Sequence, residues 1–202
     1  MKQMDIFEML YPEFRFRRPI RLVELFAGYG SQSLALSYLH ADYESWKICE
    51  WNYKSFHAYR LMHREPLIDR ASSMTDRQLE DFILSRGVSS DWNKAMTAGE
   101  IKRLPLAKKK QIVDDIFSTR NLVDISKVHG LDLEIEKEKE RKHDYLFTYS
   151  FPCQDLSLAG HRKGMGKGSG TRSGLLWEFE RIMKELADLK ERPEVLLMEN
   201  VP

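Results

Sequence analysis

Short apolar stretches alternate with amphipathic ones along the first third of the chain, and this alternation constrains the fold more than any other feature. Residues 19–26 predict a buried strand that runs into a glycine turn, and residues 43–50 predict the next strand. Helices are predicted between and after these strands, at residues 33–39 and 53–63. This order predicts an α/β fold with a doubly wound, mostly parallel sheet.

Two later apolar stretches each lead into a chemically reactive side chain. Residues 144–149 precede a segment that contains Cys153, and residues 195–198 precede Glu199. Both stretches predict buried strands. Ligands of open α/β sheets bind in the crevice outside the carboxyl ends of the strands. We therefore expect the thiol of Cys153 and the carboxylate of Glu199 to face the same crevice.

The pattern changes between residues 66 and 121, where the sequence predicts a mostly helical insertion. Helices are expected at residues 75–85 and 107–117, and the first begins with a capping-box pattern that ends at Gln78. We expect the insertion to be a solvated accessory surface rather than a separate catalytic unit. Residues 122–125 are expected to resume the sheet as a short strand end.

Cysteine usage and composition exclude several classes of protein. Cys49 and Cys153 are the two cysteines, and neither has a second metal-spaced ligand nearby, so we expect no metal and no disulfide framework. Cys49 lies in a predicted strand and is expected to be buried. The 202 residues are most simply one domain, without an apolar run near the roughly 20 residues of a membrane helix or an N-terminal signal core. These features predict a cytoplasmic protein.

The glycine turn after the first predicted strand indicates a ligand that contains a nucleoside. Gly28 and Gly30 lie between a strand and a helix, where backbone N–H groups are free, although Ser33 stands where a dinucleotide fingerprint has its third glycine. Glu50 follows the next strand about 20 residues later, the usual place of a carboxylate that holds a ribose diol. Trp51 could stack on adenine, or could simply pack in the core.

Two short motifs resemble those of a known enzyme family. Pro152-Cys153-Gln154 and the later Glu-Asn-Val triplet that starts at Glu199, in this order, closely resemble the catalytic motifs of the DNA cytosine-C5 methyltransferases. The resemblance implies a Rossmann-like fold that uses S-adenosyl-L-methionine, with a catalytic domain at residues 20–202 after an N-terminal extension at 1–19. It also implies the catalytic residues, which are Cys153, Glu199 and Pro152.

The implied chemistry can be stated atom by atom. A Cys153 thiolate adds to carbon 6 of cytosine, which makes carbon 5 nucleophilic enough to take an electrophilic methyl group. Glu199, as an acid or hydrogen-bond partner at ring N3, stabilises the charge that the addition develops. A base, water being one candidate, then removes the proton from carbon 5, and the thiol is eliminated. Pro152 fixes the backbone angle before the nucleophile.

The resemblance extends to the cofactor and to DNA. The residues that it implies for S-adenosylmethionine are Phe26, Gly28, Gly30, Glu50, Trp51, Asp124, Ile125 and Leu175. Residues 160–172 are rich in glycine and basic residues, which favours a lid that closes on double-stranded DNA when the target base is flipped out. The implied DNA contacts are Gln154, Ser157, Arg162, Lys163, Lys167 and Arg172.

The resemblance covers residues 20–202 apart from the 66–121 insertion, and it covers only the N-terminal part of the family's architecture. The segments that the family carries after Glu-Asn-Val, including the target-recognition domain, are absent from the sequence. We therefore expect a C-terminally incomplete catalytic portion that needs a complement, for which a separate C-terminal polypeptide is one source. The alternatives are an inactive remnant that binds a nucleoside, and a tRNA cytosine-5 methyltransferase.

Overall fold

The computed structural model describes residues 16–150 and 175–199, and within them it contains a four-stranded parallel sheet. The strands are β1 (Ile20–Leu25), β2 (Tyr43–Cys49), β3 (Asp144–Tyr149) and β4 (Val195–Met198), in the order β2-β1-β3-β4. The predicted α/β fold is confirmed, since every strand pair in this sheet is parallel. Most of the expected N-terminal extension lies outside the described residues.

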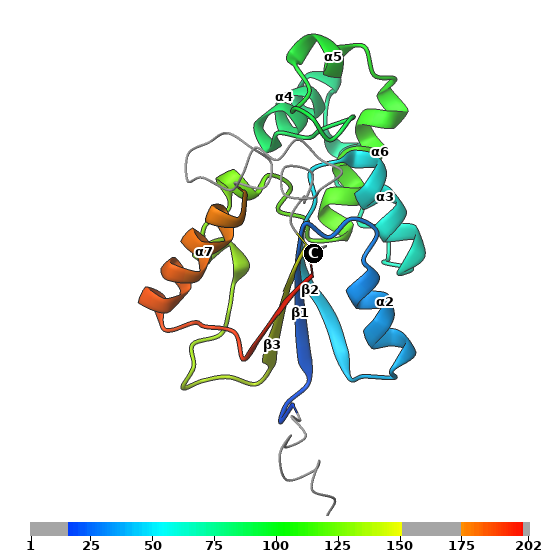
Figure 1. The fold of residues 1–202 in the computed structure, drawn as a ribbon. Coiled ribbons are helices and arrows are strands. Elements are labelled where there is room, and N and C mark those ends of the chain that lie inside the picture. Colours follow the sequence, from blue (N-terminus) through cyan, green and yellow to red (C-terminus); the bar gives the residue numbers. More distant parts are fainter. Residues whose placement is uncertain (1–15, 151–174, 200–202) are drawn as a thin grey trace, which may run out of the picture.

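Helices cover both faces of the sheet. Figure 1 shows α7 (Leu176–Leu189) on one face, and α2 (Ser31–Tyr38) and α3 (Tyr53–Met62) on the other. The central strands β1 and β3 are therefore covered on both sides, which explains why all but one residue of each strand is buried. This double cover confirms the doubly wound arrangement. The three helices lie on the connections from β1 to β2, from β2 towards β3, and from β3 to β4.

The segment between residues 66 and 121 is mostly helical, as predicted. It contains η1 (Ala71–Ser73), α4 (Asp76–Arg86), α5 (Ala98–Lys102) and α6 (Leu106–Ser118). The capping box at the start of α4 is confirmed: the Gln78 N–H donates to Oγ1 of Thr75, and the Thr75 N–H donates to Oε1 of Gln78 at 2.8 Å.

This segment has a packed side as well as a solvated one. The apolar sides of α4 and α6 pack in one cluster with Ile48 of β2 and with Phe56 and Tyr59 of α3. Ile112 and Ile116 of α6 are both buried, and their i,i+4 spacing places them on one stripe of the helix. The segment is therefore part of the same core as the sheet.

The short strand expected at residues 122–125 is also absent. Asn121 makes one isolated parallel bridge with Ile48, and the chain then turns, because Val123 adopts a left-handed backbone conformation with φ of 67°. The helices η2 (Ile125–Lys127) and η3 (Gly130–Leu133) follow. Asn121 fixes this turn: its side chain accepts from the Glu50 N–H at 3.0 Å and donates to the Glu50 carbonyl at 2.8 Å.

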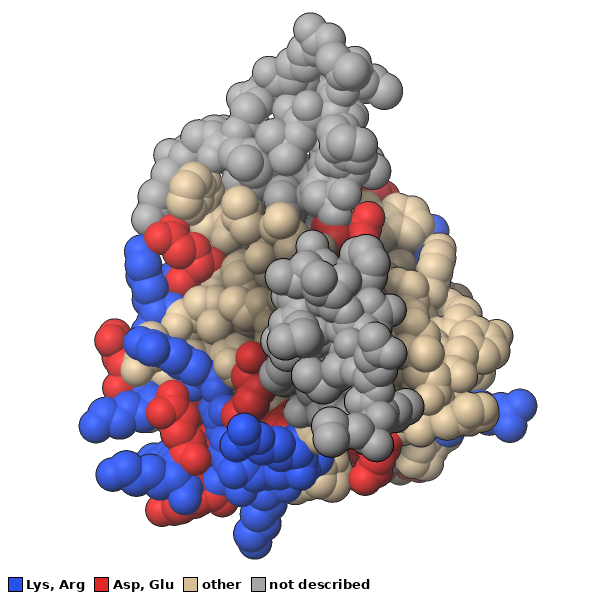
Figure 2. Space-filling view, turned by 60° about the horizontal axis from the view of Figure 1, so that its bottom comes forward, with Lys and Arg blue, Asp and Glu red and all other residues tan. Residues whose placement is uncertain are grey.

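Charge is intermixed on the face that Figure 2 brings forward. Lysine and arginine side chains gather on one part of this face, and acidic side chains lie among them. The formal net charge of the chain is +1, so basic and acidic residues nearly balance. None of the helices that the structure describes is both long and apolar enough to span a bilayer.

Candidate functional site

The carboxyl ends of the four strands are aligned in one row. Leu25 of β1 pairs with Cys49 of β2 and with Tyr149 of β3, and Tyr149 pairs in turn with Met198 of β4. The residues that directly follow these four ends are Phe26, Glu50, Ser150 and Glu199. The chain leaves β1 towards β2 and leaves β3 in the opposite direction towards β4, so a topological switch point lies between β1 and β3. Switch points of this kind are where open α/β sheets bind ligands.

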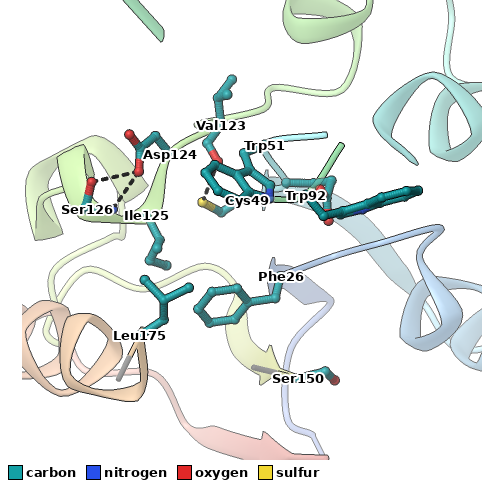
Figure 3. Close-up of a pocket in the computed structure, with 11 residues that line it drawn as sticks. Phe26, Cys49, Trp51, Trp92, Val123, Asp124, Ile125, Ser126, Ser150 and Leu175 are labelled. Atoms are coloured by element: carbon teal, nitrogen blue, oxygen red, sulfur yellow. Dashed lines mark hydrogen bonds between the residues drawn. The ribbon is translucent and has the colours of Figure 1, made fainter. Parts of the chain in front are cut away.

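A cavity of about 570 Å³ opens at this row of strand ends. Its volume lies within the range of about 300–1,000 Å³ that is typical of small-molecule sites. Its lining combines apolar and aromatic faces with a few carboxylate and hydroxyl groups (Figure 3). The lining residues are Phe26, Cys49, Glu50, Trp51, Trp92, Val123, Asp124, Ile125, Ser126, Ser150 and Leu175.

Glu50 joins the cavity wall to the glycine turn. Its carboxylate accepts one hydrogen bond from the Gly28 N–H at 3.0 Å and another from the Asn52 N–H at 2.7 Å. Burial of the side chain raises the pKa of Glu50 to about 7, and the backbone hydrogen bonds oppose that rise. An ionised carboxylate has about four acceptor sites, so both oxygens keep capacity for the hydroxyl groups of a ligand.

Gly28 and Gly30 allow the backbone conformation of the turn. Gly28 and Gly30 have φ values of 55° and 79°, which favour glycine over any residue with a Cβ. A Cβ at Gly30 would collide with the ring of Tyr59 in α3 and with His63 at the C-terminal end of that helix. Neither glycine is among the lining residues, so their contribution is the path of the backbone and, at Gly28, the N–H that Glu50 accepts.

Asp124 and Ile125 reach the cavity through the turn that replaces the expected strand. One Asp124 oxygen accepts from the N–H of Ser126 at 3.1 Å and from its hydroxyl at 2.7 Å, which fixes the carboxylate (Figure 3). Ile125 and Leu175 lie on the side of the cavity near Phe26. The structure thus brings together six of the eight residues that the family resemblance implied for a cofactor: Phe26, Glu50, Trp51, Asp124, Ile125 and Leu175.

The catalytic candidates are only partly within the described residues. Pro152, Cys153, Gln154, Ser157, Arg162, Lys163, Lys167 and Arg172 lie outside them. Glu199 is described, and its N–H donates to the Tyr149 carbonyl at 3.2 Å, which continues the pairing of β4 with β3. Ser150, three residues before Cys153, accepts a hydrogen bond from the Gln32 side chain at 3.2 Å. Glu199 and the start of the Cys153 segment therefore leave neighbouring strands at the same edge of the sheet.

Sequence reasoning missed Trp92, which lines the cavity from the helical segment. The polar turn around it, Ser89-Ser90-Asp91-Trp92-Asn93, gives a weak signal, because a large aromatic residue stands alone among turn-forming residues. Cys49 was expected in an apolar setting, and this is confirmed: it is buried, and its thiol donates to the Val123 carbonyl at 3.3 Å. In the described part of the chain no group of three potential ligands is arranged to hold a metal ion.

The chemistry of the cavity is compatible with a nucleoside. Flat aromatic and aliphatic faces suit a heterocyclic ring, while the Glu50 and Asp124 carboxylates can accept hydrogen bonds from polar groups of a ligand. The cavity lies beside the strand ends that lead to Cys153 and Glu199. A bound nucleoside would therefore lie next to the candidate catalytic residues.

Comparison with known proteins agrees with this geometry. Residues 102–202 match the model of the C-5 cytosine-specific DNA methylase family. The chain is 35% identical over 188 residues to the orphan methyltransferase M.SssI of Spiroplasma monobiae, covering 91% of this chain and 47% of that protein. It is 34% identical over 190 residues to the type II methyltransferase M2.ScrFI of Lactococcus lactis subsp. cremoris, covering 90% of this chain and 47% of that protein. The chain thus spans about half the length of these relatives, and it belongs to the C-5 cytosine-specific DNA methylase family.

Proposed function

We propose that this chain forms the cofactor-binding and catalytic part of an enzyme that methylates carbon 5 of cytosine in DNA. The observation that carries the proposal is the row of aligned strand ends. Phe26 and Glu50 follow two of these ends and line a cavity suited to a nucleoside, whereas Ser150 and Glu199 follow the other two. A cofactor and a reacting base would thereby meet at one edge of the sheet.

The cavity residues would bind and orient S-adenosylmethionine, which supplies an electrophilic methyl group when it is bound. Glu50 would accept from the ribose hydroxyls, and Asp124 would accept from the adenine amino group. Phe26, Ile125 and Leu175 would pack against the adenine ring and exclude water from it. The expected gain is orientation, because a methyl group held in line with carbon 5 reacts far faster than one that diffuses freely.

In the proposed reaction, the Cys153 thiolate forms a bond to carbon 6 of a flipped cytosine. This addition displaces the electron pair of the carbon 5–carbon 6 double bond onto carbon 5, and that pair then forms a bond from carbon 5 to the methyl group as the bond from the methyl group to sulfur breaks. Glu199 donates a hydrogen bond or proton at ring N3 and stabilises the negative charge of the adduct. A base, such as water, takes the carbon 5 proton, the double bond reforms, and Cys153 leaves as the thiolate.

The segment after Cys153 would contact DNA. Arg162, Lys163, Lys167 and Arg172 would neutralise backbone phosphates, and binding should then weaken steeply as salt increases. Gln154 and Ser157 would contact the strand next to the flipped base. Because the chain spans about half of its relatives, we propose that residues equivalent to their remaining half, on the same or a separate polypeptide, supply sequence recognition.

Covalent trapping tests the proposed chemistry. The purified chain is incubated with S-adenosylmethionine and with duplex DNA that carries 5-fluorocytosine. After methyl transfer, carbon 5 of this analogue carries fluorine instead of a removable proton, so Cys153 cannot be eliminated and the adduct persists. The incubation is done alone and with the C-terminal half of M.SssI as a complement. We expect a covalent adduct at least in the complemented reaction, and we expect none with Cys153→Ala.

Two controls make this test specific. Cys49→Ala identifies which cysteine is the nucleophile: the Cys49 thiol lines the cavity but is buried and bonded to the Val123 carbonyl, so an adduct, even in lower yield, should still form. A transfer RNA that carries 5-fluorocytosine, offered in place of DNA, distinguishes the two nucleic acids. An adduct with the RNA alone would contradict DNA as the substrate. No adduct in any reaction that still binds S-adenosylmethionine would contradict the catalytic assignment and leave a nucleoside-binding module.

A further inference from the structure

A turn of the helical segment is attached directly to the loop that follows β2. The Ser89 N–H donates to the Trp51 carbonyl at 2.8 Å, and the Tyr53 N–H donates to the Ser89 carbonyl at 3.0 Å. The Met96 N–H closes the turn on the Val88 carbonyl at 2.8 Å. These bonds make short bridges on either side of the turn, so residues 88–96 keep a fixed position relative to Trp51.

Trp92 occupies the tip of this turn in a costly backbone conformation. Its φ is 60°, in the left-handed region that disfavours side chains with a Cβ, and a bulky aromatic residue is rare there. Local hydrogen bonds maintain the conformation: the Trp92 N–H donates to Oγ of Ser89 at 3.1 Å, and the Asn93 N–H donates to Oδ1 of Asp91 at 2.9 Å. Strained residues that surrounding structure holds in place are concentrated at functional sites.

Burial does not explain why a tryptophan stands at this position. Trp92 is 45% exposed, so folding recovers only part of the free energy that a fully buried indole would contribute. The exposed surface borders the cavity that Glu50 and Trp51 also line. Figure 3 shows Trp92 beyond Trp51, on the side away from Asp124.

We propose that Trp92 is a further cofactor-binding residue, which forms a second aromatic wall of the nucleoside cavity beside Trp51. The inference rests on the proposed function for the identity of the nucleoside. With the base amino group at Asp124 and the ribose at Glu50, the indole of Trp92 would pack against the ribose side of the ligand and exclude water from it. The segment at 66–121 would then take part directly in cofactor binding.

Calorimetric titration of the purified chain with S-adenosylhomocysteine tests the inference without catalysis. Trp92→Gly removes the indole and also relieves the left-handed strain, so we expect affinity to fall about tenfold. Thermal stability should stay unchanged or increase. Trp92→Phe keeps an aromatic face and should bind within about threefold of the wild type.

Two matched variants control for strain and for aromatic surface. Lys190 also has φ of 60°, at the end of α7, so Lys190→Gly relieves strain away from the cavity. Tyr38 is 76% exposed and does not line the cavity, so Tyr38→Ala removes an exposed aromatic ring elsewhere. Both variants should bind S-adenosylhomocysteine as the wild type does.

Unchanged affinity in Trp92→Gly, with affinity lost in Glu50→Ala, would overturn the role of Trp92 and leave the proposed function intact. A lower melting temperature in Trp92→Gly, with binding and stability both restored in Trp92→Phe, would assign a structural role to the ring and overturn the inference. Reduced nucleoside binding in Trp92→Gly by a chain that forms no adduct in trapping would support the inference while contradicting the proposed chemistry. A wild-type chain that binds no S-adenosylhomocysteine would overturn both.

Discussion

Glu24 shows how a single buried carboxyl group can make the stability of the fold depend on pH. Its side chain accepts from the Tyr59 hydroxyl at 2.6 Å and from the Ser33 N–H at 3.2 Å, behind the glycine turn. Burial raises the pKa of Glu24 to about 7, from about 4.5 in an unfolded chain, although both hydrogen bonds lower it. The folded state therefore binds the Glu24 proton more tightly than the unfolded state does.

The sign of the resulting pH dependence follows from linkage. The stabilising contribution is fully present below about pH 4.5 and is lost as pH rises through about 7, because the folded state then contains a buried charge. Between pH 5 and pH 8, we expect the free energy of unfolding of the wild type to fall by roughly 1–3 kcal/mol more than that of Glu24→Gln. Urea unfolding of both proteins at the two pH values measures the difference. Equal pH dependence in wild type and Glu24→Gln would contradict this account.

Among the secondary-structure elements, α3 and α6 are joined by a buried ionic group. Asp115 of α6 is bonded to His57, with an Nδ1–Oδ2 distance of 2.7 Å, and to the guanidinium of Arg60, both on α3. The Asp115 side chain is 1% exposed, whereas that of Arg60 is 17% exposed. Removing the carboxylate would leave a poorly hydrated positive charge between two packed helices.

We expect Asp115→Ala to lower the free energy of unfolding by about 3 kcal/mol, because one partner of a buried ion pair is left uncompensated. Chemical denaturation measures the loss. Asp81→Ala is the matched control, since Asp81 pairs with Arg77 on the surface at 3.9 Å, and its removal should cost less than about 0.5 kcal/mol. A cost for Asp115→Ala as small as that of the control would show that α6 does not depend on this attachment.

Elements with a strong local pattern could be predicted from sequence, and elements defined by tertiary hydrogen bonds could not. The strand at 195–198 and the Thr75 capping box are local, and both were predicted where the structure has them. The turn at Val123 depends on the Asn121 side chain and on a left-handed backbone, so its apolar sequence was mistaken for a strand. The position of Trp92 depends on bonds from Ser89 to a loop far away in the sequence.

At the scale of the whole molecule, the sheet is covered unevenly. The central strands are buried, but Leu196, Leu197 and Met198 of β4 are each about half exposed. Successive side chains of a strand point to opposite faces, so β4 exposes apolar surface on both faces of the sheet. In the part of the chain that the structure describes, β4 pairs with β3 alone. Exposed apolar strands of this kind associate readily.

We expect the isolated 202-residue chain to self-associate as its concentration rises, through the β4 surface. Leu197→Lys should weaken that association at least several-fold with little effect on folding, because the Leu197 side chain is already 50% exposed. Sedimentation velocity over a concentration series measures the effect. Leu131→Lys, at a side chain that is 68% exposed and lies outside the sheet, is the control. Equal association in both variants would place the contact elsewhere.

The buried Cys49 is also an internal probe of local opening. Burial raises the pKa of its thiol well above the usual range, and the side chain is only 2% exposed, so alkylating reagents cannot reach a reactive thiolate in the closed protein. In a Cys153→Ser variant, the rate of labelling would report how often the sheet opens at β2. Because Cys49 also lines the cavity, slower labelling with S-adenosylhomocysteine present would report direct shielding of the thiol by the ligand together with less frequent opening of the strand ends.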